Sequence, residues 1–206
     1  MGFGILFFGY FLLLNITYYV FTDVVSGLLM AYALFKISSV SSYFKRPLYL
    51  SIAFAIFGLV ELVLGGLDLF GIISVSGFSN YMSIVRAVIL CLFTVLLLRA
   101  MLSIAKELEV KDLPVKCAAM SIWTVLYYVA EISFNTGFLA NLIPDSAISV
   151  IYLVLIIASI MLPIANLTAI FSCYRWICLP EDLEREPVPF FPFGKKDDET
   201  KRNGKK

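Results

Sequence analysis

The chain has 206 residues, of which 61% are hydrophobic and only 15% are charged, and its formal net charge is +1. Soluble domains contain about 45–50% apolar and about 25% charged residues, and a chain of this length cannot bury so large an apolar excess in one core. The composition therefore excludes a soluble enzyme, a nucleic-acid-binding module and a disordered chain, and it predicts a multi-pass membrane protein.

The apolar residues are grouped in six segments. A helix needs about 20 apolar residues to cross the hydrocarbon core of a bilayer. In chain order the segments cover residues 3–19, 24–38, 48–73, 82–104, 115–139 and 147–174. We expect an all-α integral membrane bundle of six transmembrane helices that occupies residues 1–179.

The boundary between the first two segments is weakly marked. Only Thr22 and Asp23 separate them, and the second segment is short. An alternative is therefore a re-entrant first segment followed by five crossings. In that arrangement we expect the N-terminus to lie outside the cell.

The basic residues indicate the orientation of the six segments. Fifteen of the sixteen basic residues are predicted to lie on one side of the membrane, and Arg86 is the exception. An excess of Lys and Arg marks cytoplasmic loops. With six crossings, both termini are predicted to be cytoplasmic. The fifteen are Lys36, Lys45, Arg46, Arg99, Lys106, Lys111, Lys116, Arg175, Arg185, Lys195, Lys196, Lys201, Arg202, Lys205 and Lys206.

Residues 180–206 differ in character from the rest of the chain. They begin with an acidic run, continue with prolines and phenylalanines, and end in mixed charges without large apolar side chains. Such a composition cannot form a packed core. We expect a cytoplasmic, largely disordered tail.

Four charged residues interrupt the apolar segments: Glu61, Asp68, Arg86 and Glu131. A charge near the bilayer centre costs at least about 2.5–3.5 kcal/mol, so such residues usually face the interior of a bundle. Gly58, Glu61, Gly65 and Asp68 are spaced by three, four and three residues, so they share one helix face. Glycines on that face would let a neighbouring backbone come close.

Polar residues recur at the same helical period in the fifth and sixth segments. Tyr128, Glu131 and Asn135 share a face of the fifth, and Asn166 lies on a polar face of the sixth with Ser159 and Pro163. We take as the candidate intramembrane polar or ligand site Glu61, Asp68, Arg86, Tyr128, Glu131, Asn135 and Asn166.

Two interpretations of this polar set remain open. In the structural one, polar residues fix helix packing, and Arg86 pairs with Glu61 or Glu131. In the functional one, they line a small cavity in the outer half of the membrane that binds a polar or cationic solute. Intramembrane charge is compatible with either role.

Several kinds of chemistry lack their characteristic residues. The sequence contains no histidine, which excludes H-E-x-x-H zinc sites, Ser–His pairs and histidine-ligated haem. It contains no P-loop and no G-x-S-x-G. The four cysteines form no C-x-x-C pair, so we expect no disulfide framework. We therefore expect no enzymatic activity, cofactor or metal site.

Two short strings carry a resemblance. Gly9-Tyr10-Phe11 and the string Cys178-Leu179-Pro180-Glu181-Asp182 resemble those of uncharacterised multi-pass membrane proteins of bacteria, which have no known activity. The resemblance implies a bacterial plasma membrane protein. The six-helix size is similar to that of the substrate-binding subunits of vitamin transporters, as an analogy of size alone.

Together these features favour a non-enzymatic accessory or assembly component of a membrane. Its expected partners are the lipid bilayer and other membrane subunits, and nucleic acid is excluded. The alternative is a solute-binding or transport subunit that takes a small polar solute at the candidate site.

Overall fold

The computed structural model describes residues 2–14, 19–39, 41–72, 79–110, 113–138 and 144–177. These residues contain no strand, and their helices confirm the predicted all-α membrane bundle. The expected tail, residues 180–206, lies outside the described part of the chain. The α-helices are α1 (Gly2–Phe11), α2 (Tyr19–Ser38), α3 (Lys45–Leu69), α4 (Ser79–Glu107), α5 (Leu113–Asn135) and α6 (Asp145–Ile177), and 3₁₀ turns follow α1 at η1 (Leu12–Leu14) and precede α3 at η2 (Ser42–Phe44).

In the described residues, five helices, α2 to α6, are long and apolar enough to cross a membrane. Their outward faces carry large apolar side chains, and α6 shows this along most of its length. Such a surface is stable against lipid, whereas water would penalise its exposure. The exposed apolar residues of α6 include Val150, Leu153, Ile157, Met161 and Ile164.

The first helix is much shorter than the expected segment 3–19. Its 10 residues rise about 15 Å, and the hydrocarbon core is about 30 Å thick. It runs antiparallel to α2: Gly2 lies beside Ile37, and Gly9 lies beside Met30. Of the two predicted arrangements, the structure fits five crossings preceded by a short first segment.

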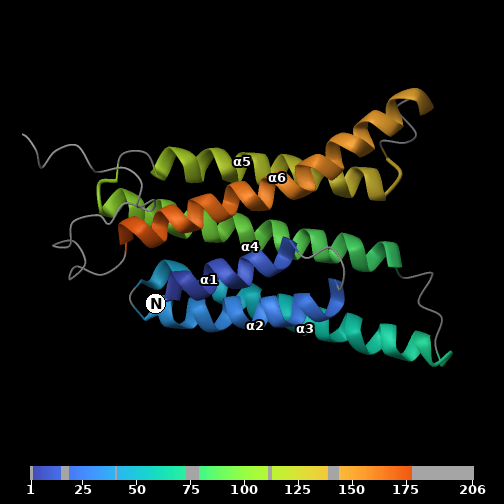
Figure 1. Cartoon of the computed structure of the whole chain (residues 1–206), viewed down its shortest axis with the longest axis horizontal. Coiled ribbons are helices and arrows are strands. Elements are labelled where there is room, and N and C mark those ends of the chain that lie inside the picture. Colours follow the sequence, from blue (N-terminus) through green and yellow to red (C-terminus); the bar gives the residue numbers. More distant parts are fainter. Residues whose placement is uncertain are drawn as a thin grey trace, which may run out of the picture.

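The starts and ends of the helices define two ends of the bundle. The start of α1, the connections from α2 to α3 and from α4 to α5, and the end of α6 all lie at the left in Figure 1. We call this the basic end, because it carries the exposed side chains of Lys36, Lys45, Arg46, Lys106, Lys116 and Arg175. The expectation that a short first segment would bring the N-terminus to the other side is wrong, since α1 begins at the basic end.

The helices follow one another around the bundle. Each helix packs against the next one in the sequence, and α1 packs against α6 as well as α2 and so closes the circle. The Tyr43 hydroxyl of η2 donates to Glu107 Oε1 of α4 at 3.0 Å, which ties the two basic-end connections together.

Two predicted breaks lie inside helices. Thr22 and Asp23 belong to the second turn of α2, and Lys45 and Pro47 belong to the first turn of α3. Proline is tolerated there because the first N–H groups of a helix have no partner within it. Asp23 can lie within the bundle because its charge is paired, as described below.

Two of the long helices end in the same backbone motif. After α3, Gly71 adopts a φ of 68°, and Ile72 N–H donates to Leu67 O at 3.0 Å. After α4, Glu109 adopts a φ of 54°, and Val110 N–H donates to Ala105 O at 3.0 Å. This is the Schellman ending, which satisfies carbonyls left over by the last turn. Glycine adopts the left-handed conformation that this ending requires without strain, whereas Glu109 adopts it at a cost in conformational energy.

The closest helix contact joins α2 and α3. A Cβ placed on Gly27 would lie 2.9 Å from backbone atoms of Ala55, and one on Gly58 would lie 3.3 Å from the Cβ of Asp23. A Cβ on Gly65 would meet nothing within 4 Å. The expected close approach along the face of Gly58 and Gly65 is therefore confirmed at Gly58 and wrong at Gly65.

Candidate functional site

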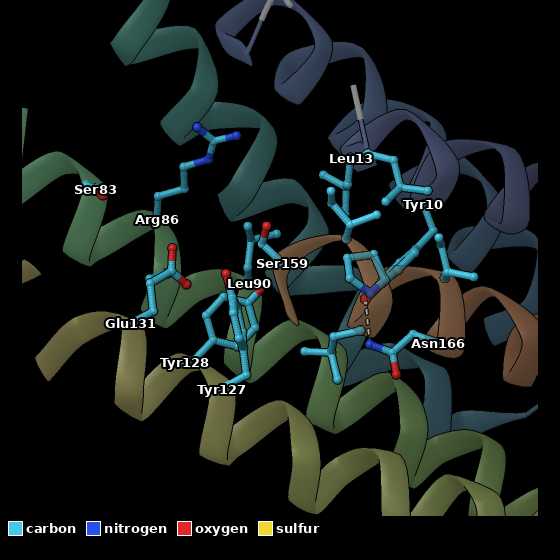
Figure 2. Close-up of a pocket in the computed structure, with 16 residues that line it drawn as sticks. Tyr10, Leu13, Ser83, Arg86, Leu90, Tyr127, Tyr128, Glu131, Ser159 and Asn166 are labelled. Carbon is cyan, nitrogen blue, oxygen red and sulfur yellow. Dashed lines mark hydrogen bonds between the residues drawn. The ribbon is translucent and has the colours of Figure 1, made fainter. Parts of the chain in front are cut away.

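A cavity of about 410 Å³ lies between the tip of α1 and the parts of α4, α5 and α6 farther from the basic end (Figure 2). Its apolar walls include Leu13 and Leu14 of η1 and Pro163 of α6. This space exists because α1 is short. A longer α1 would place side chains in it. The polar part of the lining comes from Tyr10, Ser83, Arg86, Tyr127, Tyr128, Glu131, Ser159 and Asn166.

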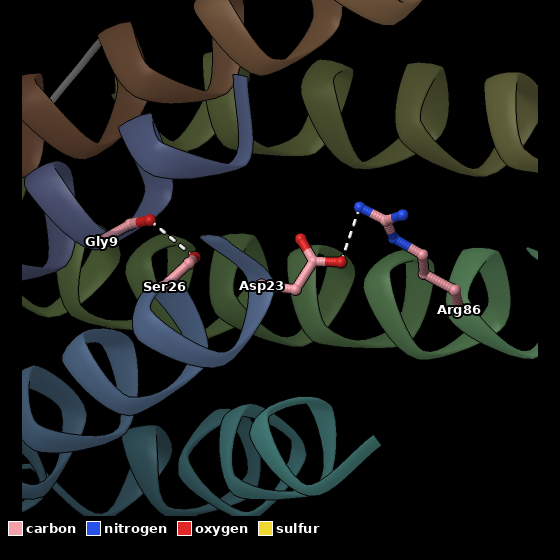
Figure 3. A network of polar contacts seen from close by, with 4 residues as sticks. All are labelled: Gly9, Asp23, Ser26 and Arg86. Atoms are coloured by element: carbon pink, nitrogen blue, oxygen red, sulfur yellow. Dashed lines mark hydrogen bonds and ion pairs between the residues drawn. The ribbon is translucent and has the colours of Figure 1, made fainter. Parts of the chain in front are cut away.

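An ion pair joins α2 to α4 beside this cavity (Figure 3). Arg86 Nη2 lies 2.7 Å from Asp23 Oδ2. The Asp23 side chain is 3% exposed and that of Arg86 is 26% exposed, so the carboxylate is the more deeply buried partner. The sequence predicted Glu61 or Glu131 as the partner of Arg86, and it did not identify Asp23.

Glu61 and Glu131 nevertheless lie within electrostatic range of Arg86. Glu61 comes from α3 and Glu131 from α5, so acidic side chains of three helices interact electrostatically with the guanidinium contributed by α4. With all four groups ionised, the cluster carries two negative charges in excess. Asp23 takes the direct contact, and Glu131 lines the cavity.

A buried hydrogen-bond chain closes the other side of the cavity. Asn166 Nδ2 of α6 donates to the Tyr10 hydroxyl at 3.0 Å, and this hydroxyl lies 3.3 Å from Thr94 Oγ1 of α4. The hydroxyl of Ser26 donates to Gly9 O at 2.7 Å, near the end of α1 (Figure 3). These contacts hold the tip of α1 against three other helices.

Two acceptors of the cavity lining have no hydrogen-bond partner among the described residues. They are Glu131 Oε2 and Asn166 Oδ1. The Tyr127 hydroxyl approaches the Glu131 carboxyl and the hydroxyl of Ser159. Leaving a buried acceptor unpaired costs about 1–3 kcal/mol. Both buried oxygens belong to residues that line the cavity.

Four of the seven predicted site residues line the cavity: Arg86, Tyr128, Glu131 and Asn166. Glu61 belongs to the charge cluster but does not line the cavity. Asp68 and Asn135 are exposed and do not line it either. Both lie near the ends of their helices, beyond the level at which neighbouring helices enclose them.

Five polar residues of the site were not among the seven predicted: Asp23, Tyr10, Tyr127, Ser83 and Ser159. Asp23 had been placed in a loop, and Tyr10 lies in an apolar run without a polar signal. Tyr127 precedes Glu131 by four residues, which brings two side chains of one helix together. That spacing could have identified Tyr127 from the sequence.

The described residues offer no group of three or more His, Cys, Asp or Glu side chains that could hold a metal ion. Cys91, Cys117 and Cys173 are free thiols. Within the part of the chain that the structure describes, the cavity lining thus consists of carboxyl, guanidinium, amide and hydroxyl groups with aromatic and aliphatic walls.

Comparisons with protein-family models, with curated proteins and with solved structures found no match. The resemblance to bacterial membrane proteins therefore gains no support beyond the two short strings that suggested it.

Proposed function

We propose that this membrane protein binds a small polar solute in the cavity, as a solute-binding or transport component, and that it does so without catalysing a reaction. The observation that carries the proposal is the unpartnered Glu131 Oε2 in a 410 Å³ cavity. Ligand sites of proteins typically measure about 300–1,000 Å³ and combine apolar walls with a few polar groups. The absence of histidine supports a role in binding rather than in acid–base catalysis.

A purely structural polar cluster would be expected to pair its own groups. The ion pair of Asp23 with Arg86 and the hydrogen bond from Asn166 Nδ2 to Tyr10 meet that expectation. Glu131 Oε2 does not, although pairing it would gain about 1–3 kcal/mol. The difference between these groups favours a ligand at Glu131.

Glu131→Gln and Glu61→Gln form a matched pair of variants for the test. Both remove one carboxylate near Arg86, but only Glu131 lines the cavity. Native mass spectrometry of the purified protein should detect a co-purifying solute in the wild type and in Glu61→Gln, and should lose it in Glu131→Gln. Melting temperatures close to that of the wild type would show that the loss concerns binding.

The same pair of variants examines the structural interpretation. If both substitutions lower thermal stability and membrane abundance to the same extent, and no solute is found in any form, the carboxylates hold the helices together. The proposed binding function would then be rejected.

We also propose that the basic end faces the cytoplasm, in a bacterial plasma membrane, so that the cavity lies in the outer half. Support comes from the positively charged residues gathered at this end. A cysteine introduced at Ser76, which lies outside the described residues, should react with a membrane-impermeant maleimide in intact cells, whereas one at Lys45 should not. The reverse pattern would invert the topology.

An accessory role remains a second candidate, favoured by the exposed face of α3 beyond Gly58. Gly65 has open space around it, and Asp68 is exposed near the end of the same helix. Small and polar residues on a lipid-facing surface favour contact with another transmembrane helix. A photo-crosslinking residue at position 65 would then form a defined product in membranes, and one at the equally open Gly4 would not.

A further inference from the structure

The charges around the cavity favour a cationic ligand. Arg86 already contacts Asp23 at 2.7 Å, so its charge is largely offset by a buried carboxylate and attracts an anion only weakly. The same anion would face Glu131, which lines the cavity, and Glu61 nearby. A cation instead offsets part of the negative excess of three carboxyls and one guanidinium, and its attraction is strengthened where water is excluded.

The walls beside Glu131 are aromatic. The rings of Tyr127 and Tyr128 meet edge to face with centroids 5.1 Å apart, and both line the cavity. Figure 2 shows these rings next to Glu131, with Tyr10 across the cavity. A cation within about 6 Å of a tyrosine ring face is attracted by the ring quadrupole. Carboxylate and rings together therefore suit an organic cation.

The unpartnered groups indicate which organic cation fits. Glu131 Oε2 and Asn166 Oδ1 are buried acceptors of two cavity-lining residues, and no described residue satisfies them. Acceptors require a ligand that carries N–H or O–H donors. A protonated primary or secondary amine supplies N–H donors together with positive charge, whereas a quaternary ammonium ion has no N–H group.

We infer that the solute of this cavity is a small protonated amine, whose ammonium group is held by the Glu131 carboxylate against the rings of Tyr127 and Tyr128. This inference rests on the proposed binding function and specifies its ligand class. The remaining volume of the 410 Å³ cavity, bounded by Leu13, Leu14 and Pro163, receives the carbon skeleton.

Three probes of one carbon skeleton test the inference: 5-aminopentan-1-ol, which is protonated at neutral pH, the uncharged pentane-1,5-diol and the anionic 5-hydroxypentanoate. Their affinities for the full-length protein in nanodiscs are measured by isothermal titration calorimetry. The amine should bind at least about tenfold more tightly than the other two, since a hydrogen bond between charged groups is worth that factor or more.

Glu131→Gln should lower the affinity for the amine at least about tenfold, whereas Glu61→Gln should change that affinity by less than about threefold. Tyr128→Phe keeps the ring and should keep the preference for the amine. Tyr128→Leu removes the ring and should weaken amine binding by about threefold or more. If Glu131→Gln does not fold, the two Tyr128 variants still provide the comparison.

Equal or tighter binding of the diol or of the carboxylate would overturn the amine assignment while leaving solute binding intact. Unchanged amine affinity in both Glu131→Gln and Tyr128→Leu would also overturn it, because the amine would then bind elsewhere. If no probe binds and no solute co-purifies with the wild type, both the amine assignment and the proposed function fail.

Discussion

The ion pair between Asp23 and Arg86 makes an asymmetric prediction for the stability of the bundle. Arg86→Met removes the cation and keeps a long apolar side chain. Asp23→Asn removes the anion and keeps a side chain of nearly the same shape. We expect Arg86→Met to destabilise the protein more than Asp23→Asn, and we expect the double variant to lose less than the sum of the two.

The magnitudes follow from burial and from the neighbours of each charge. At an effective dielectric constant of about 20, unit charges about 4 Å apart attract by about 4 kcal/mol. Arg86→Met leaves the 2% exposed Asp23 without its cation and close to the acidic Glu61. An unpaired buried charge of this kind costs about 3–5 kcal/mol of stability. Asp23→Asn leaves Arg86, 26% exposed, within range of Glu61 and Glu131, so we expect a loss of about 1–2 kcal/mol.

Unfolding of the four forms in mixed micelles with increasing sodium dodecyl sulfate, followed by far-ultraviolet circular dichroism, gives the required free energies. The double-variant cycle should yield a coupling of about 1–3 kcal/mol. Arg99→Met serves as the control, because Arg99 is exposed on the same helix and its loss should cost less than about 0.5 kcal/mol. If the two single losses are equal and simply add in the double variant, the reasoning from burial is refuted.

Three further predictions concern packing, backbone conformation and the buried hydrogen-bond chain. Gly27→Ala should destabilise by about 1–3 kcal/mol because its Cβ would lie 2.9 Å from backbone atoms of the facing helix, whereas Gly65→Ala should be neutral or slightly stabilising in the same unfolding assay. Glu109→Gly should stabilise by about 1 kcal/mol, because glycine adopts the observed φ of 54° without the clash of a Cβ; a loss of stability would contradict this. Tyr10→Phe should cost about 1–3 kcal/mol by unpairing Asn166 Nδ2, and an unchanged melting temperature would show that this hydrogen bond is not needed.

Helical periodicity predicts which face a residue occupies but not whether another helix reaches that depth. Glu61 and Asp68 were placed on one face of the third segment, and the helix confirms one continuous element there. However, α2 begins at Tyr19, and its Asp23 already packs at the level of Gly58. The last turns of α3 therefore extend past the start of α2, and Asp68 is exposed.

Pairing between distant segments was the other feature that the sequence could not show. A charge at the edge of an apolar run is ordinarily a loop residue, so the sequence predicts a break at Asp23. Its partner Arg86 lies on a different helix, and only the folded arrangement brings the two within 2.7 Å. Arg86 was recognised as an intramembrane charge, but the identity of its counter-ion depends on how α2 and α4 are oriented about their axes.

The position of the cavity follows from the length of α1. In the half of the bundle nearer the basic end, α1 packs between α2 and α6 and its Leu6 is fully buried. The described first segment ends at Leu14. Among the described residues, α1 therefore does not extend along the other half of the bundle. Tyr10 lies near the transition, where its hydroxyl contacts both α4 and α6, and beyond it the polar side chains of α4, α5 and α6 line open space. A first helix that stops partway thus both anchors the packed half of the bundle and leaves room for a ligand in the other.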